Sequence, residues 1–243
     1  MQRRLVRLLA LGLILAAPAF AQDSATASTI DLPPPATNQP VIYPVGSEPQ
    51  PEPSPVLWNG PIATIGSVKL DSATKTVIAT GWVNQTSGPI EVLACGPAGK
   101  VHESVFVLGL NPLDLQTALL LAGLKSGEPM PAIGEGPPNG DPVDVFVDWQ
   151  ADGQTKTARA ETFVWNIEDD ANVDETPWIF TGSVVKDGQF KALAEESLAV
   201  TYWDPYAIVN LPLPCGSNDE ILVVNSNTVP PYQTPVTIRF VPR

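Results

Sequence analysis

Residues 143–153 read VDVFVDWQADG, and this stretch decides the fold class of the chain. Its valines and Trp149 occupy every second position, while Asp144 and Asp148 lie between them. Successive side chains of a β-strand point to opposite faces of a sheet, so the pattern predicts a strand with one face buried and one in water. Asp152-Gly153 then supplies the positive φ angles that a two-residue hairpin turn requires. The stretch therefore predicts an antiparallel hairpin.

The same alternation recurs on both sides of this hairpin. Residues 67–71 (SVKLD) and 236–240 (VTIRF) each alternate apolar and polar side chains, and a second Asp-Gly pair stands at 187–188. Asp204-Pro205-Tyr206 is expected to begin a loop after a strand-like run at 198–203, and the last strand should close the sheet before Pro242. We expect a mainly β domain, either an antiparallel sandwich or a strongly bent antiparallel sheet.

One segment is helical in character. Asn111 is suited to the N-cap, Pro112 to the first helical position and Asp114 to the first turn, while Gly123 ends the run. Leucines recur between these limits, and such a stripe most often packs on a sheet. The sequence predicts one α-helix at residues 112–122, covering a face or an end of the sheet.

The N-terminus has the order of charge, apolar core and small residues that signal peptidase recognises. Three arginines precede an apolar run from Leu8 to Ala17, and Ala19-Phe20-Ala21 follows it. The run is roughly half the length that a membrane span needs. We predict a cleavable signal peptide at 1–21, and hence a periplasmic or extracellular protein with no membrane span after cleavage.

Composition separates the rest of the chain into two parts. Residues 22–56 are rich in proline and poor in aromatic side chains, which predicts a disordered, semi-rigid tether. The patterned residues 57–243 are predicted to form one β-rich domain.

Charge and cysteine content exclude several classes of function. The chain has 13 basic and 26 acidic residues, and removal of three arginines with the signal peptide leaves 10 − 26 = −16. That charge opposes nucleic acid and anionic membranes as partners. Cys95 and Cys215 are the only cysteines and form no CxxC motif, which argues against a zinc ribbon, a thioredoxin-type site or an iron–sulfur centre. No haem or nucleotide motif is present either, so the sequence leaves any cofactor unassigned.

Residues 90–108, IEVLACGPAGKVHESVFVL, contain the one constellation with possible chemistry. We interpret them as two strands joined by a turn centred on Ala98-Gly99. In such a hairpin Cys95 would face His102, the sole histidine, with Cβ atoms about 5 Å apart. Glu103 would point to the opposite face, and Lys100 would be in water.

Three interpretations of this hairpin remain open. In the structural one its polar groups stabilise a loop, and Cys95 is a small buried side chain or is bridged to Cys215. In the catalytic one His102 activates the Cys95 thiolate as a nucleophile, with Glu103 and Lys100 as further candidates. In the metal one Cys95 and His102 supply two ligands and a carboxylate the third.

An acidic segment offers a second set of candidate metal ligands. Residues 167–176, IEDDANVDET, place Asp170, Asn172 and Asp174 at alternate positions, as in calcium loops. The turn glycine and the distal glutamate of such loops are missing. A solvated acidic loop is therefore the favoured interpretation.

The order of these motifs resembles the YdjY-domain family of exported bacterial proteins. The resemblance is carried by EVLACGPAGKVHES (91–104), LQTALLLAGLKSG (115–127), VDVFVDWQADGQTKTARAETFVWN (143–166), PWIFTGS (177–183) and TPVTIRFVP (234–242). It covers nearly all of residues 67–242, and Cys95, Lys100, His102 and Glu103 occupy its most distinctive motif, whereas Cys215 lies outside it. The resemblance implies an exported, stand-alone domain and brings no agreed activity, substrate or cofactor.

We therefore expect an exported, non-enzymatic envelope domain that binds a protein partner or small ligand through the loop around Cys95 and His102. The alternative is a thiol- or metal-dependent enzyme that uses the same two residues.

Overall fold

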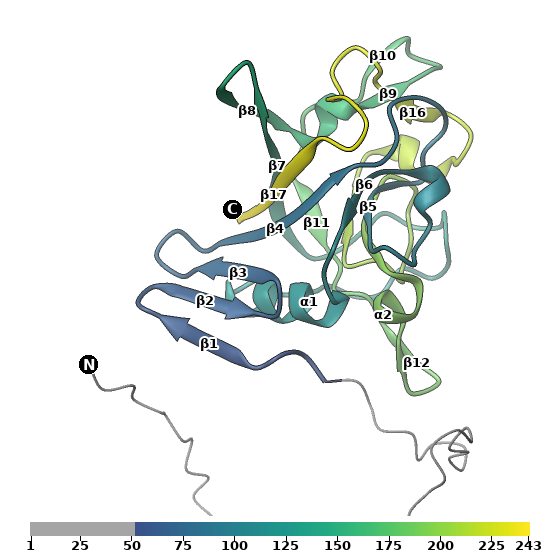
Figure 1. The fold of residues 1–243 in the computed structure, drawn as a ribbon. Helices are drawn as coiled ribbons and strands as arrows, with labels where there is room; N and C mark the ends of the chain where they lie inside the picture. The colour runs from purple at the N-terminus through teal and green to yellow at the C-terminus, as the bar shows by residue number, and fades with distance from the viewer. Residues whose placement is uncertain (1–51) are drawn as a thin grey trace, which may run out of the picture. The chain divides into compact units, whose positions relative to one another are not determined.

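The computed structural model describes residues 52–243, which form a mainly β domain (Figure 1). The predicted signal peptide and most of the predicted tether lie outside the described residues. The strands are β1 (Val56–Asn59), β2 (Ile62–Ile65), β3 (Val68–Asp71), β4 (Thr76–Val83), β5 (Val92–Cys95), β6 (Ser104–Leu108), β7 (Asp141–Ala151), β8 (Gln154–Arg159), β9 (Val164–Asn166), β10 (Ala171–Asn172), β11 (Trp178–Phe180), β12 (Val185–Lys186), β13 (Gln189–Phe190), β14 (Ser197–Val200), β15 (Val209–Asn210), β16 (Leu222–Val224) and β17 (Pro235–Pro242). The α-helices are α1 (Pro112–Leu121) and α2 (Lys191–Glu195), and the 3₁₀ turns are η1 (Val101–Glu103), η2 (Ala160–Phe163) and η3 (Pro214–Ser217). Within residues 52–243, no helix is both long enough and apolar enough to cross a membrane.

The prediction of a mainly β domain is confirmed, but the main sheet closes on itself into a barrel, which corrects the expectation of a sandwich. Its strand order is β1-β2-β3-β4-β17-β7-β11-β15-β14-β5-β6, and β8 pairs with β7 outside this order. Strand β6, the last of the order, also pairs with β4. Eight strands therefore form a closed barrel, and β1, β2 and β3 extend from it. Closure depends on long-range pairing, which local sequence patterns do not report.

Strand β4 makes this closure possible because one of its edges serves two partners. Its first residues pair with β3, whereas Gly81, Trp82 and Val83 pair with β6. A Cβ atom at Gly81 would lie 2.0 Å from the carbonyl oxygen of Val107. Glycine is therefore required where the edge of β4 passes from one partner to the other.

The local predictions around residues 143–153 are confirmed. Strands β7 and β8 form a hairpin around Asp152 and Gly153, whose φ angles are 53° and 71°. Val143, Val145 and Val147 are fully buried. The second Asp-Gly pair connects β12 to β13 in the same way, with φ angles of 54° and 74°.

The final strand lies inside the sheet and not at an edge. Strand β17 pairs with β4 on one side and β7 on the other, both antiparallel. Its inward residues Val236, Ile238 and Phe240 pack in the core with Phe106 and Phe163, whose rings meet edge to face. The C-terminal strand β17 thus connects β4 with β7 in the wall of the barrel.

The predicted helix is present as α1. The Asn111 side chain accepts a hydrogen bond from the Leu113 amide at 2.9 Å, and Gly123 follows the helix with a φ angle of +100°. Leu115 and Leu119 are fully buried, whereas Leu120 and Leu121 are about half exposed. The helix contacts β2, β3 and β4, so it covers the junction between the barrel and its extension.

Ser54, which precedes the first strand, contacts helix α1. The backbone amide and hydroxyl of Ser54 donate to the carboxylate of Asp114, at 2.7 and 2.9 Å. Asp114 is only 2% exposed and lies in the first turn of α1. This contact attaches the end of the proline-rich segment to the folded domain.

We predict that Gly81→Ala destabilises the domain by about 1 to 3 kcal/mol, because the added methyl group overpacks the β4–β6 junction. Gly109→Ala is the matched control, since a Cβ atom there meets nothing within 4 Å. Urea unfolding of both variants tests this. Equal stabilities would show that the junction tolerates a side chain.

Candidate functional site

The segment that carries the candidate site does not form the expected hairpin. Strands β5 and β6 are parallel neighbours, with Val92 opposite Ser104 and Cys95 opposite Val107. The eight residues 96–103 cross from the end of one strand to the start of the other. Parallel neighbours usually need a connection of a dozen residues or more, so this crossover is short. The prediction of an antiparallel turn centred on Ala98-Gly99 was wrong.

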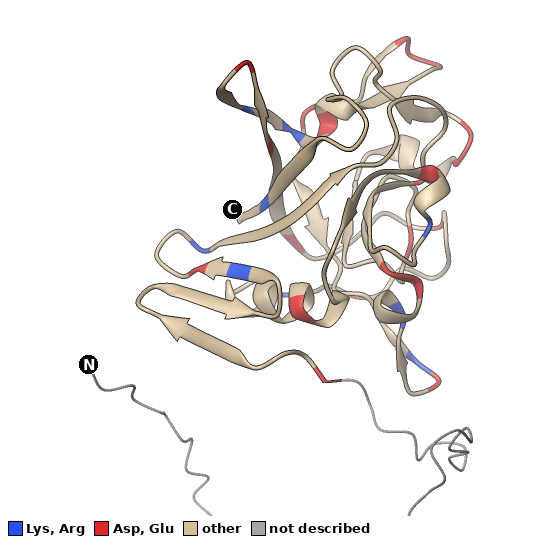
Figure 2. Cartoon of the chain, viewed as in Figure 1, with Lys and Arg blue, Asp and Glu red and all other residues tan. Residues whose placement is uncertain are grey.

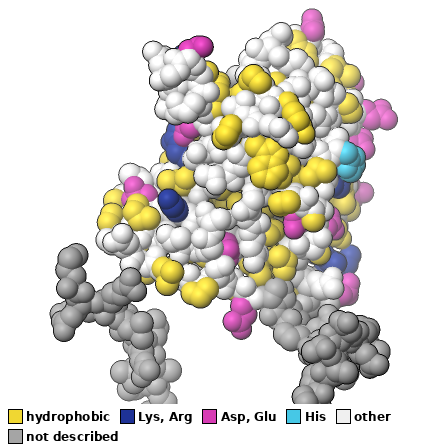
Figure 3. All heavy atoms as spheres, in the orientation of Figure 1, with side chains coloured by type: hydrophobic (Ala, Val, Ile, Leu, Met, Phe, Trp, Pro, Cys, Tyr) yellow, Lys and Arg dark blue, Asp and Glu magenta, His cyan; other side chains and the backbone are white. Residues whose placement is uncertain are grey.

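The parallel arrangement separates Cys95 from His102. Cys95 is fully buried and packs with Val92, Val107, Val200 and Ala207. His102 lies in η1 with its side chain 77% exposed, at the surface of the molecule (Figure 3). Its only charged contact within the described residues is Glu103, at 3.8 Å. The imidazole–thiol pair that the catalytic and metal interpretations require is therefore not assembled.

The environment of Cys95 also opposes a reactive thiolate. Burial raises the pKa of the Cys95 thiol, and the charges of Glu196 and Glu103 raise it further, against a hydrogen bond with Ser104 that lowers it. A thiolate nucleophile needs the opposite shift. Both cysteines are free thiols, so the bridge between Cys95 and Cys215 that the sequence allowed is not formed.

The motif residues stabilise the short crossover. The Ala98 amide donates to the Glu196 carboxylate at 2.7 Å, and the Gly96 amide donates to the Glu196 backbone oxygen at 2.8 Å. A Cβ atom at Gly96 would lie 2.2 Å from the same carboxylate, so only glycine leaves room for this contact. The loop between β5 and β6 is thus tied to the end of α2.

Lys100 ties the other side of the crossover. Its ammonium group lies 2.5 Å from Glu91 and 3.3 Å from Glu103. Burial acts to lower the pKa of Lys100, but the bonds and charges of the two glutamates outweigh it, so the pKa is raised. Lys100 and Glu103, two of the sequence candidates, therefore act as a structural ion pair.

The space beside this loop is too small for a ligand. Glu91, Lys100, Tyr202 and Asp204 line a pit of about 10 Å³. That volume is near the lower limit for a single water molecule. The pit beside Lys100 is therefore too small to hold a ligand.

Asp204 is the most perturbed carboxyl group in this region. It is 5% exposed, and burial, with smaller contributions from the charges of Glu195 and Glu91, raises its pKa to about 6. The Tyr206 amide donates to its carboxylate at 2.7 Å, within the loop predicted after residue 203.

The acidic segment 167–176 does not gather its three predicted ligands. Asp170, Asn172 and Asp174 are exposed, and the Asn172 side-chain oxygen accepts a bond from Asn225 at 2.6 Å. Asn172 and Asp174 line an open hollow of about 450 Å³ with Asp169 and Cys215, whereas Asp170 does not. Within residues 52–243, no three His, Cys, Asp or Glu side chains are arranged to hold a metal ion.

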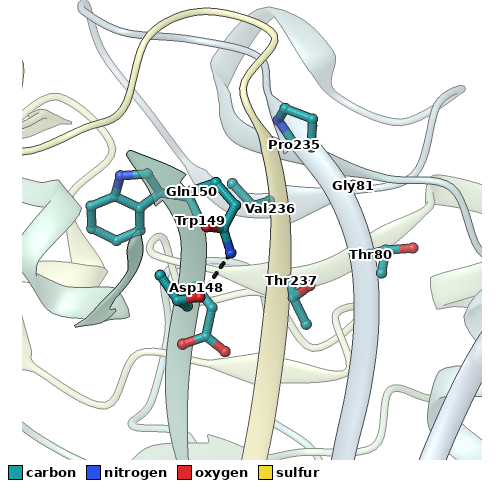
Figure 4. A pocket seen from close by; sticks show the side chains of 9 residues that line it. Thr80, Gly81, Asp148, Trp149, Gln150, Pro235, Val236 and Thr237 are labelled. Atoms are coloured by element: carbon teal, nitrogen blue, oxygen red, sulfur yellow. Dashed lines mark hydrogen bonds between the residues drawn. The ribbon is translucent and has the colours of Figure 1, made fainter. Parts of the chain in front are cut away.

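A different hollow, which the sequence analysis missed, lies on the outer face of β4, β17, β7 and β8 (Figure 4). Its volume is about 420 Å³, within the usual range of small-ligand sites. The lining residues are Thr80, Gly81, Asp148, Trp149, Gln150, Thr155, Pro235, Val236 and Thr237. Thr237 stands between Thr80 on β4 and Asp148 on β7, so segments more than 150 positions apart in the sequence form one polar row.

The charge on the floor of this hollow is neutralised within the sheet. Asp148 accepts hydrogen bonds from the Arg239 guanidinium at 2.6 and 3.1 Å and from the Thr157 hydroxyl at 2.6 Å. Burial acts to raise the pKa of Asp148, but these bonds and the Arg239 charge outweigh it and lower the pKa. Asp148 therefore remains ionised and paired at neutral pH.

The other polar groups of the hollow are neutral. The Gln150 amide donates to the Thr155 hydroxyl at 2.7 Å. The hydroxyls of Thr80 and Thr237 make no hydrogen bond to another side chain or backbone group of residues 52–243. The hollow thus offers free hydroxyls beside a neutralised ion pair, with the exposed ring of Pro235 as apolar surface.

Comparison with known proteins supplies a family but no activity. The family model of the YdjY domain matches residues 68–241. The chain belongs to the YdjY-domain family. No curated protein and no solved structure matches it. In this YdjY domain, the most distinctive motif of the chain forms the β5–β6 crossover.

We predict that Cys95 resists alkylation in the native protein, because its thiol is buried and its pKa is raised. Iodoacetamide labelling at neutral pH, read by mass spectrometry of peptides, should modify the half-buried Cys215 first and Cys95 only after unfolding. Cys215→Ala is the control that isolates the Cys95 signal. Rapid labelling of Cys95 in that folded variant would restore the thiol-enzyme alternative.

We also predict that Asp204→Asn stabilises the domain at neutral pH. The folded-state pKa of Asp204 is raised from 3.8 to about 6, so its contribution is favourable below 3.8 and is lost as pH rises through about 6. Two pKa units correspond to at most about 3 kcal/mol. Urea unfolding should show a gain of about 1 to 3 kcal/mol at about pH 8 and little change at about pH 4. An equal loss at both pH values would contradict this.

Proposed function

We propose that this YdjY domain is an exported, non-enzymatic binding module whose ligand surface is the hollow on β4, β17, β7 and β8. The observation that carries the proposal is that hollow, with its row of threonine hydroxyls, its neutralised ion pair and its volume of about 420 Å³. The N-terminal order of arginines, apolar core and Ala19-Phe20-Ala21 supports export. We favour the sheet over the loop around Cys95 and His102 because the pit beside Lys100 of that loop has a volume of only about 10 Å³.

The chemistry of the hollow favours a neutral ligand with several hydroxyl groups. Thr80, Thr155 and Thr237 can each donate and accept, and Gln150 adds an amide. The Asp148–Arg239 pair presents no net charge, and the acidic chain as a whole repels anions. The exposed ring of Pro235 gives apolar surface for the C–H face of a sugar ring. A neutral glycan is the class of ligand that is complementary to these properties of the hollow.

The proposal is tested on the chain recovered from the periplasm of a bacterial host, whose mass should correspond to a start at Gln22. An oligomer of β-1,4-linked N-acetylglucosamine serves as the probe. Its addition should shift the amide resonances of Thr80, Gly81 and Thr237 in a nitrogen–proton correlation spectrum. The sugar should be recovered uncleaved, as a binding module requires.

Removing hydroxyls without changing volume provides the matched variants. The double variant Thr80→Val/Thr237→Val should weaken binding about tenfold or more, because the ligand hydroxyls then lose their hydrogen bonds to the two threonine hydroxyls. Thr64→Val, on β2 and outside the hollow, should leave the affinity unchanged. Absence of shifts at the hollow with saturating oligosaccharide, or cleavage of the probe, would refute the proposal.

A further inference from the structure

The main sheet has an uncovered edge at β1. Among residues 52–243 this strand pairs only with β2, so its other edge presents backbone groups that no strand of the described domain pairs with. All four residues are exposed, and Leu57 and Trp58 are 66% and 56% exposed. Consecutive large apolar side chains on an open edge are a template for pairing with another strand.

The edge is held in position by the rest of the domain. Ser54, two residues before the strand, is fixed to the buried carboxylate of Asp114 in α1. The other side of β1 is in full register with β2, from Val56 opposite Ile65 to Asn59 opposite Ile62. The strand is therefore ordered before any partner arrives, which lowers the entropic cost of association.

The charge pattern indicates what kind of partner this edge accepts. Residues 53–68 contain no Asp, Glu, Lys, Arg or His, although the chain has 26 acidic residues. In Figure 2 the ribbons of β1 and β2 carry no charged residue, in contrast to the neighbouring β3. Charged residues are a common protection of sheet edges, and they are missing here. Two copies of an acidic protein can approach along this edge with the least mutual repulsion.

We propose that β1 pairs antiparallel with β1 of a second copy, so that the two sheets continue into one another. A two-fold axis perpendicular to the sheet leaves each side chain on its own face. A residue is then opposed by itself or by a residue an even number of positions away. An axis through Leu57 places Leu57 opposite its own copy and Val56 opposite the second copy's Trp58.

The register with the axis through Leu57 pairs the side chains of β1 by chemical type. It opposes every exposed apolar side chain of β1 with another apolar side chain, and it forms two pairs of an aromatic and a β-branched residue. An axis through Trp58 would instead place Leu57 opposite Asn59 and Val56 opposite Gly60. A strand from a different protein would satisfy the same backbone groups, but it would not need this self-complementary order.

Light scattering with size-exclusion chromatography of the full exported chain tests the association. The dimer fraction should rise from micromolar to submillimolar concentration. Leu57→Lys and Trp58→Lys should each weaken dimerisation at least about tenfold by placing like charges across the dyad. Val185→Lys is the matched control, because Val185 is 70% exposed on a different hairpin, and it should dimerise normally.

Cysteine crosslinking tests the register itself. In a Cys215→Ala background, Leu57→Cys should form a disulfide dimer on mild oxidation, because directly opposed Cα atoms lie about 4.5 to 5.5 Å apart. Asn59→Cys and Val185→Cys should not. A monomer at every concentration, a dimer insensitive to both lysine variants, or equal crosslinking at all three positions would overturn the proposal.

Discussion

The closed sheet depends on how β4 divides one of its edges between β3 and β6. The transition occurs at Gly81, where the carbonyl oxygen of Val107 occupies the space of a side chain. Without this contact the path from β17 through β5 to β6 would remain an open sheet with an unpaired edge at β6. That closure places the β5–β6 crossover beside β4, whose other edge pairs with β17 and forms part of the outer hollow.

The family motif stabilises the short connection between the parallel strands β5 and β6. Two parallel neighbours joined by only eight residues force the backbone to turn sharply, and its polar groups need partners. Gly96 gives room for Glu196, Glu196 accepts from the loop, and Lys100 links Glu91 with Glu103. A motif that combines cysteine, lysine, histidine and glutamate thus has a structural explanation in which only the His102 side chain remains largely free.

The two proposed binding surfaces are an outer face and an edge of the main sheet. The hollow on β4, β17, β7 and β8 presents hydroxyls and a neutralised ion pair, and the uncharged β1 edge presents backbone groups and apolar side chains. The two surfaces lie on different parts of the main sheet, since β1 belongs to the extension and the hollow to the strands of the barrel and β8. Ligand binding and self-association would therefore not compete for the same residues.

The sequence by itself determined the elements whose causes are local. Alternation identified β3, β7 and β17, the Asp-Gly pairs identified two hairpins, and Asn111, Pro112 and Gly123 bounded the helix, because each signal acts within a few residues. Tertiary structure alone decided the direction in which β5 meets β6, and with it the separation of Cys95 from His102. Strand direction is set by partners such as β14 and β4, which pair with these strands from distant parts of the chain. The hollow was likewise invisible in the sequence, because Thr80 and Thr237 become neighbours only through the pairing of β4 with β17.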